Sequence, residues 1–171
     1  MEAVCRWIDR INAATGTVAA WLIAPLIGAM CYEVFARYVF NAPTIWAYEL
    51  AYLLTGSGWL LGMAYALSKG AHIRIDVLYL NMPPRARAAV DVAGYVLLLL
   101  PFLLWLTATL DDRAIAAFQS GEKTGQSAWN PPLWPFRAVF FLSFALLALQ
   151  VVGEVLRKLP VLLGRAAAER R

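Results

Sequence analysis

The amino-acid sequence predicts an all-α integral membrane protein with four transmembrane helices and short interfacial helices. Two observations predict this fold class. Of the 171 residues, 61% are apolar and only 15% are charged, and the mean hydropathy is +0.62, whereas an ordinary soluble domain is about 45–50% apolar and about 25% charged. The chain also contains four long stretches without Asp, Glu, Lys or Arg, at residues 11–32, 50–68, 92–110 and 138–153. Because a spanning helix needs about 20 mainly apolar residues, we expect a single membrane domain over residues 1–171, with spans at 12–36, 46–68, 90–110 and 134–156.

The first span, 12–36, is longer than the apolar core of a secretory signal peptide, so we expect it to be a permanent helix. Its helix is predicted to continue past the apolar stretch, because Glu33 and Arg37 are four residues apart and can pair on one helix face. Asn41 and Pro43 then end the helix, since proline lacks an N–H and restricts the residue before it.

The second span, 46–68, is predicted to start with Thr44 as its N-cap and with Glu49 in its first turns, near the positive end of the helix dipole. The simplest interpretation of the connection is a turn at the membrane surface. The alternative is that Arg37 and Glu49, on facing helix ends, pair with each other or with a partner, because charges this close to hydrocarbon are costly and usually matched.

The same span carries a row of small residues. Gly58 and Gly62 are four residues apart, and Ala66 extends the row. Small residues let another helix approach closely in lipid, and we expect this helix packing within the chain in preference to another subunit. Three tryptophans fall inside the spans and are expected to pack against protein: Trp21, Trp59 and Trp105.

The connection after the second span predicts a short amphipathic helix at 76–81, capped by Asp76, lying in the membrane interface and ended by Pro83. His72 precedes it. Because no second titratable group inside the membrane could receive a proton, we expect His72 to hydrogen-bond to lipid or protein and not to act as a proton relay.

The third span, 90–110, contains Pro101, which is expected to kink it as Pro25 kinks the first. Residues 111–132 are predicted to form a loop with a water-exposed polar centre. The aromatic and proline-rich segment beginning at Trp134 starts and anchors the fourth span, 134–156.

The orientation of the spans follows from the basic residues. Eleven of the fifteen Lys and Arg residues fall in the N-terminal segment, the second loop and the C-terminal tail. Cytoplasmic loops carry an excess of Lys and Arg. We therefore expect both termini in the cytoplasm, and the first and third loops on the outer side.

Several function classes lack the residues they need. The basic residues are dispersed between apolar blocks, which excludes a nucleic-acid module. Cys5 and Cys31 would lie nearly 40 Å apart along a helix (~1.5 Å per residue), too far for a disulfide, and the lone His72 leaves haem and tetrahedral zinc without enough ligands. No phosphate-binding loop or nucleophile motif is present. We therefore expect no cofactor, no metal and no enzymatic activity.

The predicted membrane interior contains uncharged polar residues only. A transporter that binds an ionic substrate usually keeps charged groups near the bilayer midplane. The absence of such a cluster indicates a subunit of a larger assembly. The interior polar residues are Thr15, Thr17, Thr55, Ser57, Thr107, Thr109, Ser143 and Gln150.

Three motifs resemble the small permease subunit of tripartite ATP-independent periplasmic (TRAP) transporters. The first motif, within residues 33–51, carries Arg37, Asn41, Pro43, Trp46 and Glu49 at the family's spacing. The second, within residues 70–79, carries His72, Arg74 and Asp76. The pair Trp134-Pro135 is similar to the third.

The resemblance implies one part of a three-part importer in the bacterial cytoplasmic (inner) membrane. A soluble periplasmic substrate-binding protein would capture an organic acid, and a large permease subunit would carry it inward, coupled to sodium that binds in that subunit. The small permease would be a structural scaffold for the large one, surrounded by the lipid bilayer. The motif residues and Glu33 are expected to shape this subunit or contact the large permease, and not to touch substrate. The outer loops are expected to lie near the binding protein.

Two other functions remain open on the sequence. A self-contained four-helix exporter of the small multidrug type would need an acidic residue in the bundle, for which Glu49 is the nearest candidate. A membrane redox subunit would need haem or thiol ligands.

Overall fold

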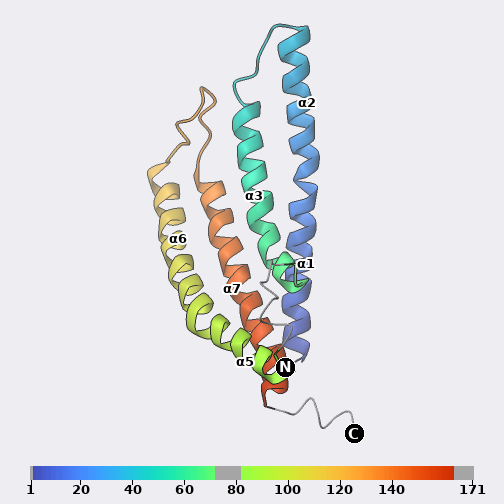
Figure 1. The fold of residues 1–171 in the computed structure, drawn as a ribbon. Coiled ribbons are helices and arrows are strands. Elements are labelled where there is room, and N and C mark those ends of the chain that lie inside the picture. Colours follow the sequence, from blue (N-terminus) through green and yellow to red (C-terminus); the bar gives the residue numbers. More distant parts are fainter. Residues whose placement is uncertain (1, 72–81, 164–171) are drawn as a thin grey trace.

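The computed structural model describes residues 2–71 and 82–163, which form a bundle of long helices (Figure 1). Four helical stretches in this described part are long and apolar enough to cross a membrane, which confirms the predicted fold class: Glu2–Val39, Ala47–Ser68, Arg85–Ser120 and Trp134–Leu162. The helices themselves are α1 (Glu2–Trp21), α2 (Ile23–Val39), α3 (Ala47–Ser68), α5 (Pro84–Ala93), the π-helix η1 (Gly94–Leu99), α6 (Leu100–Ser120) and α7 (Trp134–Leu162). The interfacial helix predicted at 76–81 lies outside the described residues.

The first span is one rod made of α1 and α2, which Figure 1 shows in line with each other. The break falls at Leu22, three residues before Pro25. Proline at this position cannot donate a backbone hydrogen bond to the carbonyl of Trp21. The helix resumes at Ile23, and the Leu26 N–H donates to the Leu22 carbonyl at 3.3 Å.

The third span is longer than the sequence predicts and is curved (Figure 1). It includes a π-helical segment, Gly94–Leu99, just before Pro101. Because Pro101 has no N–H for the Leu97 carbonyl, a local change of helical pitch there accommodates the ring. The helix then continues ten residues beyond the expected end at 110, and Gly121, in the left-handed conformation (φ +62°), caps it.

Helix α7 is the centre of the bundle, because it contacts α6, α3, α5 and α1. Its inward face carries Leu146, Leu147 and Val151, which pack with Leu67 of α3 and Leu103 of α6 in the buried core. The other spans each leave a broad apolar face uncovered.

The bundle has two distinct ends, which Figure 1 shows clearly. At the terminal end lie the N-terminal turns of α1, the helix α5 and the C-terminal turns of α7. At the loop end lie the turn between α2 and α3 and the loop of residues 121–133. The two ends therefore separate the predicted cytoplasmic and outer connections.

The tryptophans inside the spans are mostly exposed in this chain, so the bundle itself does not supply the protein contacts expected for them. Trp21 is 72% exposed, Trp59 is 78% exposed and Trp105 is 66% exposed. Their rings are therefore available to lipid or to another chain.

Candidate functional site

The first motif folds into a clamp around Glu33, which is buried although it belongs to a span-length helix. One carboxylate oxygen accepts a hydrogen bond from Arg37 Nε at 2.9 Å and pairs with the guanidinium. The other accepts the backbone N–H of Thr44 at 2.8 Å and also binds its hydroxyl. Glu33 therefore ties the last turns of α2 to the turn that leads into α3.

The turn itself depends on Asn41, whose φ of +50° is left-handed. Asparagine tolerates this conformation better than most residues. The Ala42 N–H donates to the Ala36 carbonyl at 3.1 Å and closes the end of α2. Pro43 and Asn41 are both exposed on the outside of this turn.

One prediction for this turn is wrong, and one of the pairings left open by the sequence is not formed. Thr44 is not the N-cap of the next helix, because α3 begins at Ala47 after Trp46 and no side chain caps it. The hydroxyl of Thr44 binds Glu33. Arg37 does not pair with Glu49, because Glu33 on its own helix takes the guanidinium.

Glu49 lies in the first turn of α3, as the sequence predicts, and is 1% exposed. One of its oxygens, Oε2, accepts a hydrogen bond from the hydroxyl of Ser127, which belongs to the loop before α7. Trp46 stacks on Tyr32 of α2 with ring centroids 5.9 Å apart. Glu49 thus fastens the long loop to α3, and Trp46 fastens the turn to α2.

The predicted residues of the second motif, His72, Arg74 and Asp76, lie outside the described residues. The structure therefore says nothing of their contacts.

The close helix contacts occur at glycines that the sequence pattern does not single out. A Cβ added to Gly16 would lie 2.6 Å from Cγ of Tyr65, and one added to Gly56 would lie 2.9 Å from Cζ of Phe136. These glycines let α1 approach α3 and α3 approach α7.

Gly58 and Gly62 instead line an open groove, which we call the glycine groove. A Cβ on Gly58 would meet only the Ala19 carbonyl at 3.6 Å, and one on Gly62 would have no neighbour within 4 Å. The groove has a volume of about 640 Å³ and lies between the α1–α2 rod and α3. Its walls include Gly16, Ala19, Leu26, Gly58, Trp59, Gly62 and Ala66. Packing within the chain, the interpretation favoured from sequence, therefore does not occur at Gly62.

A polar network at the terminal end ties α1 and α7 together. Asn12 Nδ2 donates to Gln150 Oε1 at 2.6 Å, and both side chains are fully buried. Nearer the terminal end, Arg157 bridges Asp9 at 2.5 Å and Glu154 at 2.9 Å. Sequence reasoning named Gln150 as an interior polar residue but missed Asn12, its partner.

A second ion pair, between Lys158 and Asp91, joins α7 to α5. These contacts tie α1 and α5 to α7 at the terminal end, and each interhelical hydrogen bond in a membrane bundle is worth about 0.6 kcal/mol on average.

The His, Cys, Asp and Glu side chains of the described part of the chain are dispersed. No group of three His, Cys, Asp or Glu side chains comes together there to hold a metal ion. Cys5 is buried, Cys31 is exposed, and the two are not bonded to each other.

Together these features define a class: a four-span helical membrane protein whose buried carboxylates are hydrogen-bonded near the helix ends and whose α2–α3 side has an open groove rich in small residues. The scan against protein families matches residues 26–161 to "Tripartite ATP-independent periplasmic transporters, DctQ component". The chain belongs to this family, which confirms the resemblance found in the motifs.

Curated relatives agree with the family. The small permease protein DctQ of a C4-dicarboxylate TRAP transporter of Vibrio cholerae is 33% identical over 85 residues, covering 47% of this chain and 37% of the relative. The small permease protein SiaQ of a sialic acid TRAP transporter of the same organism is 30% identical over 77 residues, 45% of this chain and 44% of the relative. The permease protein SiaT of a sialic acid TRAP transporter of Haemophilus influenzae is 34% identical over 77 residues, 45% of this chain and 12% of that longer protein. The chain spans less than half the length of these relatives.

Proposed function

We propose that this chain is the small membrane subunit of a binding-protein-dependent, sodium-coupled importer of organic acids. Its role is to be the structural scaffold on which a large permease subunit sits. Sodium and substrate bind in the large permease, and a soluble periplasmic protein delivers the substrate. The observation that carries the proposal is the glycine groove, an unfilled apolar groove rich in small residues in a protein of this family.

The groove has the composition of a helix–helix interface in lipid. Helices associate in membranes where small residues let their backbones approach. On α3, Thr55, Trp59, Gly62 and Ala66 follow one another at helical spacing along the groove. Thr55 and Trp59 are exposed and add a hydroxyl and an indole N–H, which usually find a hydrogen-bond partner when buried.

Large apolar side chains are exposed on both edges of the bundle, including Ile27, Val34 and Phe35 of α2, so the small residues of the glycine groove are what distinguish the α2–α3 side. The exposed side chains of η1 and α6 are mostly large and apolar, including Leu97, Leu98, Phe102 and Leu104. Such a surface suits lipid tails. We therefore assign the α2–α3 side to the large permease and the α6 side to the bilayer.

The relatives support the choice of partner and substrate class. In SiaT of Haemophilus influenzae, a segment similar to this chain is a small part of a longer permease protein. A helix of that longer chain is the natural occupant of an equivalent groove. The names of the relatives refer to C4-dicarboxylate and to sialic acid, both of which fit an organic-acid importer.

The positions of the charged groups favour a structural role for this chain over a role as a carrier of substrate. Within the described spans, Glu33 is held by Arg37 and Thr44, and Glu49 is held by Ser127. Both carboxylates lie near helix ends, whereas a carrier of an ionic substrate usually keeps charged groups near the bilayer midplane. The self-contained exporter is not favoured, and the proposal includes no catalytic step.

Reconstitution tests the proposed function. The large permease of the same system is placed in proteoliposomes with and without this chain, and uptake of a C4-dicarboxylate and of sialic acid is measured with the binding protein and an inward sodium gradient. We expect sodium-dependent uptake only when both subunits are present, and none from this chain alone. Uptake or proton-coupled efflux by this chain alone, abolished by Glu49→Gln, would contradict the scaffold role.

The proposal also fixes the orientation in the inner membrane. The terminal end faces the cytoplasm, because the basic residues of the described N-terminal turns of α1, of helix α5 and of the C-terminal turns of α7 lie at that end. A reporter that is active only in the cytoplasm, fused to the N-terminus, should be active, and the same reporter inserted at Gly125 in the loop before α7 should be inactive. The reverse pattern would overturn this orientation.

A further inference from the structure

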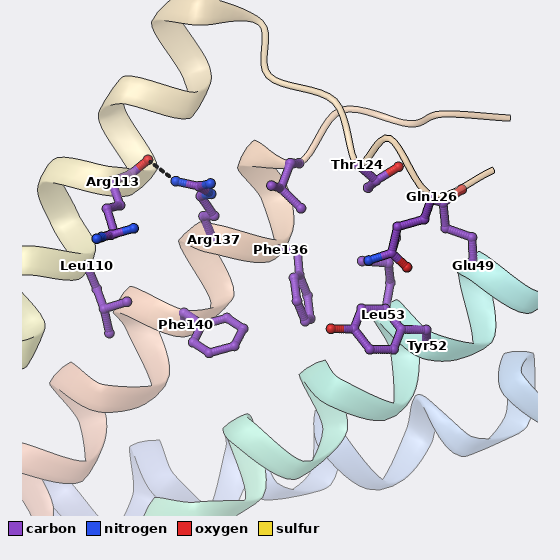
Figure 2. Close-up of a pocket in the computed structure, with 11 residues that line it drawn as sticks. Glu49, Tyr52, Leu53, Leu110, Arg113, Thr124, Gln126, Phe136, Arg137 and Phe140 are labelled. Atoms are coloured by element: carbon purple, nitrogen blue, oxygen red, sulfur yellow. Dashed lines mark hydrogen bonds between the residues drawn. The ribbon is translucent and has the colours of Figure 1, made fainter. Parts of the chain in front are cut away.

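A second cavity lies at the loop end of the bundle, away from the glycine groove. It has a volume of about 330 Å³ and lies between α3, α6 and α7, next to the loop of residues 121–133 (Figure 2). This volume is at the small end of the range for ligand pockets, about 300–1,000 Å³. The cavity has walls of three different chemical kinds.

One wall of the cavity contains a carboxylate oxygen that has no hydrogen-bond partner in the described structure. Glu49 lines the cavity and is 1% exposed. Its Oε2 is bound by Ser127, but Oε1 is buried and has no hydrogen-bond partner among the described residues. The hydroxyl of Thr124, also in the wall, is buried without a partner in the same part of the chain. A buried carboxylate oxygen without a partner is costly, so this wall is suited to a cationic donor.

The opposite wall is cationic, and Figure 2 shows Arg113 and Arg137 across the cavity from Glu49. Arg137 is already engaged, by Glu122 at 2.5 Å and by the Arg113 carbonyl at 3.4 Å. The Arg113 guanidinium, in contrast, has no carboxylate partner in the described structure. This wall is suited to an oxyanion, since guanidinium groups bind phosphate through paired N–H donors.

The third wall is apolar. The rings of Phe136 and Phe140 line the cavity between the two charged walls, with Leu53 and Leu110 beside them (Figure 2). The level of the cavity is also informative, because Glu49 and Arg137 both lie in the first turns of spanning helices. Helix ends of this kind lie near the headgroups of the bilayer.

We propose that this cavity binds a phosphoethanolamine group, with its ammonium on Glu49 and its phosphate on Arg113, supported by Arg137. A zwitterion satisfies both charged walls, whereas a simple anion leaves Oε1 of Glu49 unsatisfied and a simple amine leaves Arg113 unmatched. The source is a phospholipid with an ethanolamine headgroup, because the apolar wall leads from the charged groups toward the spanning helices and can receive the start of the acyl chains. This site does not depend on the scaffold role and can be tested without a partner.

Lipid binding to the full-length chain tests the proposal. The purified protein is depleted of lipid in detergent and titrated with phosphatidylethanolamine or phosphatidylcholine, and the number of bound lipids is counted by native mass spectrometry. The trimethylated choline group cannot donate a hydrogen bond to Glu49. We expect one high-affinity lipid per chain and a preference for ethanolamine over choline of about tenfold, the worth of one charged hydrogen bond.

Two variants separate the two charged walls. Glu49→Gln should remove the preference between the two lipids. Arg113→Gln should weaken both lipids equally and keep the preference, and it is safe for folding because Arg113 is exposed. Lys123→Gln is the matched control, since Lys123 is an exposed cation at the same end that does not line the cavity.

Three results would overturn the proposal. The first is equal binding of the two lipids by the unmodified chain. The second is a loss in Lys123→Gln as large as that in Arg113→Gln. The third is binding of water-soluble phosphoethanolamine as tight as that of the lipid, which would assign the site to a soluble zwitterion instead of the bilayer.

Discussion

Substituting Gly62 by leucine should weaken the association with the large permease without unfolding this chain. Gly62 lines the glycine groove, and an added Cβ would have no neighbour within 4 Å. The leucine side chain would therefore occupy space that is empty in this subunit. If a helix of the large permease fills that space, the two must clash.

The size of the effect follows from the cost of overfilling a packed interface. Extra methylene groups in a well-packed site cost about 1–3 kcal/mol, which corresponds to about 5- to 150-fold weaker binding. The chain itself should keep its stability, because leucine is a better helix former than glycine by about 0.5–1 kcal/mol. Gly28→Leu is the matched control: it is the same substitution, Gly28 is equally open, and it lies about 200° around the helix from Leu26 of the groove wall.

The assay is a titration of the labelled chain with the large permease of its own system in mild detergent, with thermal unfolding of the isolated chain measured in parallel. We expect a raised dissociation constant for Gly62→Leu, an unchanged one for Gly28→Leu, and unfolding temperatures no lower than that of the parent chain. Unchanged binding by Gly62→Leu, or an equal loss in Gly28→Leu, would refute the assignment of the groove.

Three other predictions concern the chain by itself. Gly16→Ala should lower the unfolding temperature in detergent, because its Cβ would clash with a neighbouring ring and such overpacking costs about 1–3 kcal/mol; an unchanged temperature would show that α1 and α3 can move apart freely. Gln150→Leu should destabilise the bundle by about 0.6 to 1.7 kcal/mol in a denaturant titration, since it leaves the Asn12 amide without its acceptor. Adding Asn12→Leu should recover part of that loss, and additive losses would mean that the two side chains are not coupled. Glu33→Ala should speed hydrogen exchange at the Thr44 amide, which loses its acceptor; equally slow exchange would show that the turn holds without the clamp.

The four spans could be predicted from the sequence because the length of each apolar stretch matches the thickness of the bilayer. Four charge-free stretches gave four spans, and Pro25 marked the break between α1 and α2. The residues at which the helices end were harder to predict. The charges of Asp111 and Arg113 mark where a helix leaves hydrocarbon, but a helix can continue through the interface into water, and α6 does so as far as Ser120.

The contacts of the candidate site could be predicted only where the two residues are close in the sequence. Glu33 and Arg37 are four residues apart, so helical spacing alone predicts their pairing. The partners of Glu49 and Gln150 lie 78 and 138 residues away, at Ser127 and Asn12. No periodicity in a single sequence brings such residues together, because only the packing of α1 and the last loop against the bundle does so.

The spacing of the glycines likewise did not predict which helix packs against them. The pattern of Gly58 and Gly62 indicates a face suited to close approach, but it does not say which helix approaches. The structure leaves that face open and uses Gly16 and Gly56, which stand outside the pattern, for the contacts inside the chain. A small-residue motif therefore predicts an interface more reliably than it predicts the partner.

Site-specific photo-crosslinking tests the central claim most directly. A photoreactive amino acid replaces Trp59, at the glycine groove, or Trp105, on the far side of the bundle, in the complete transporter in its native membrane. Both rings lie inside spans and are mostly exposed, so the two positions are matched. The account predicts a crosslink to the large permease from position 59 and none from position 105. A crosslink from position 105 alone would contradict it.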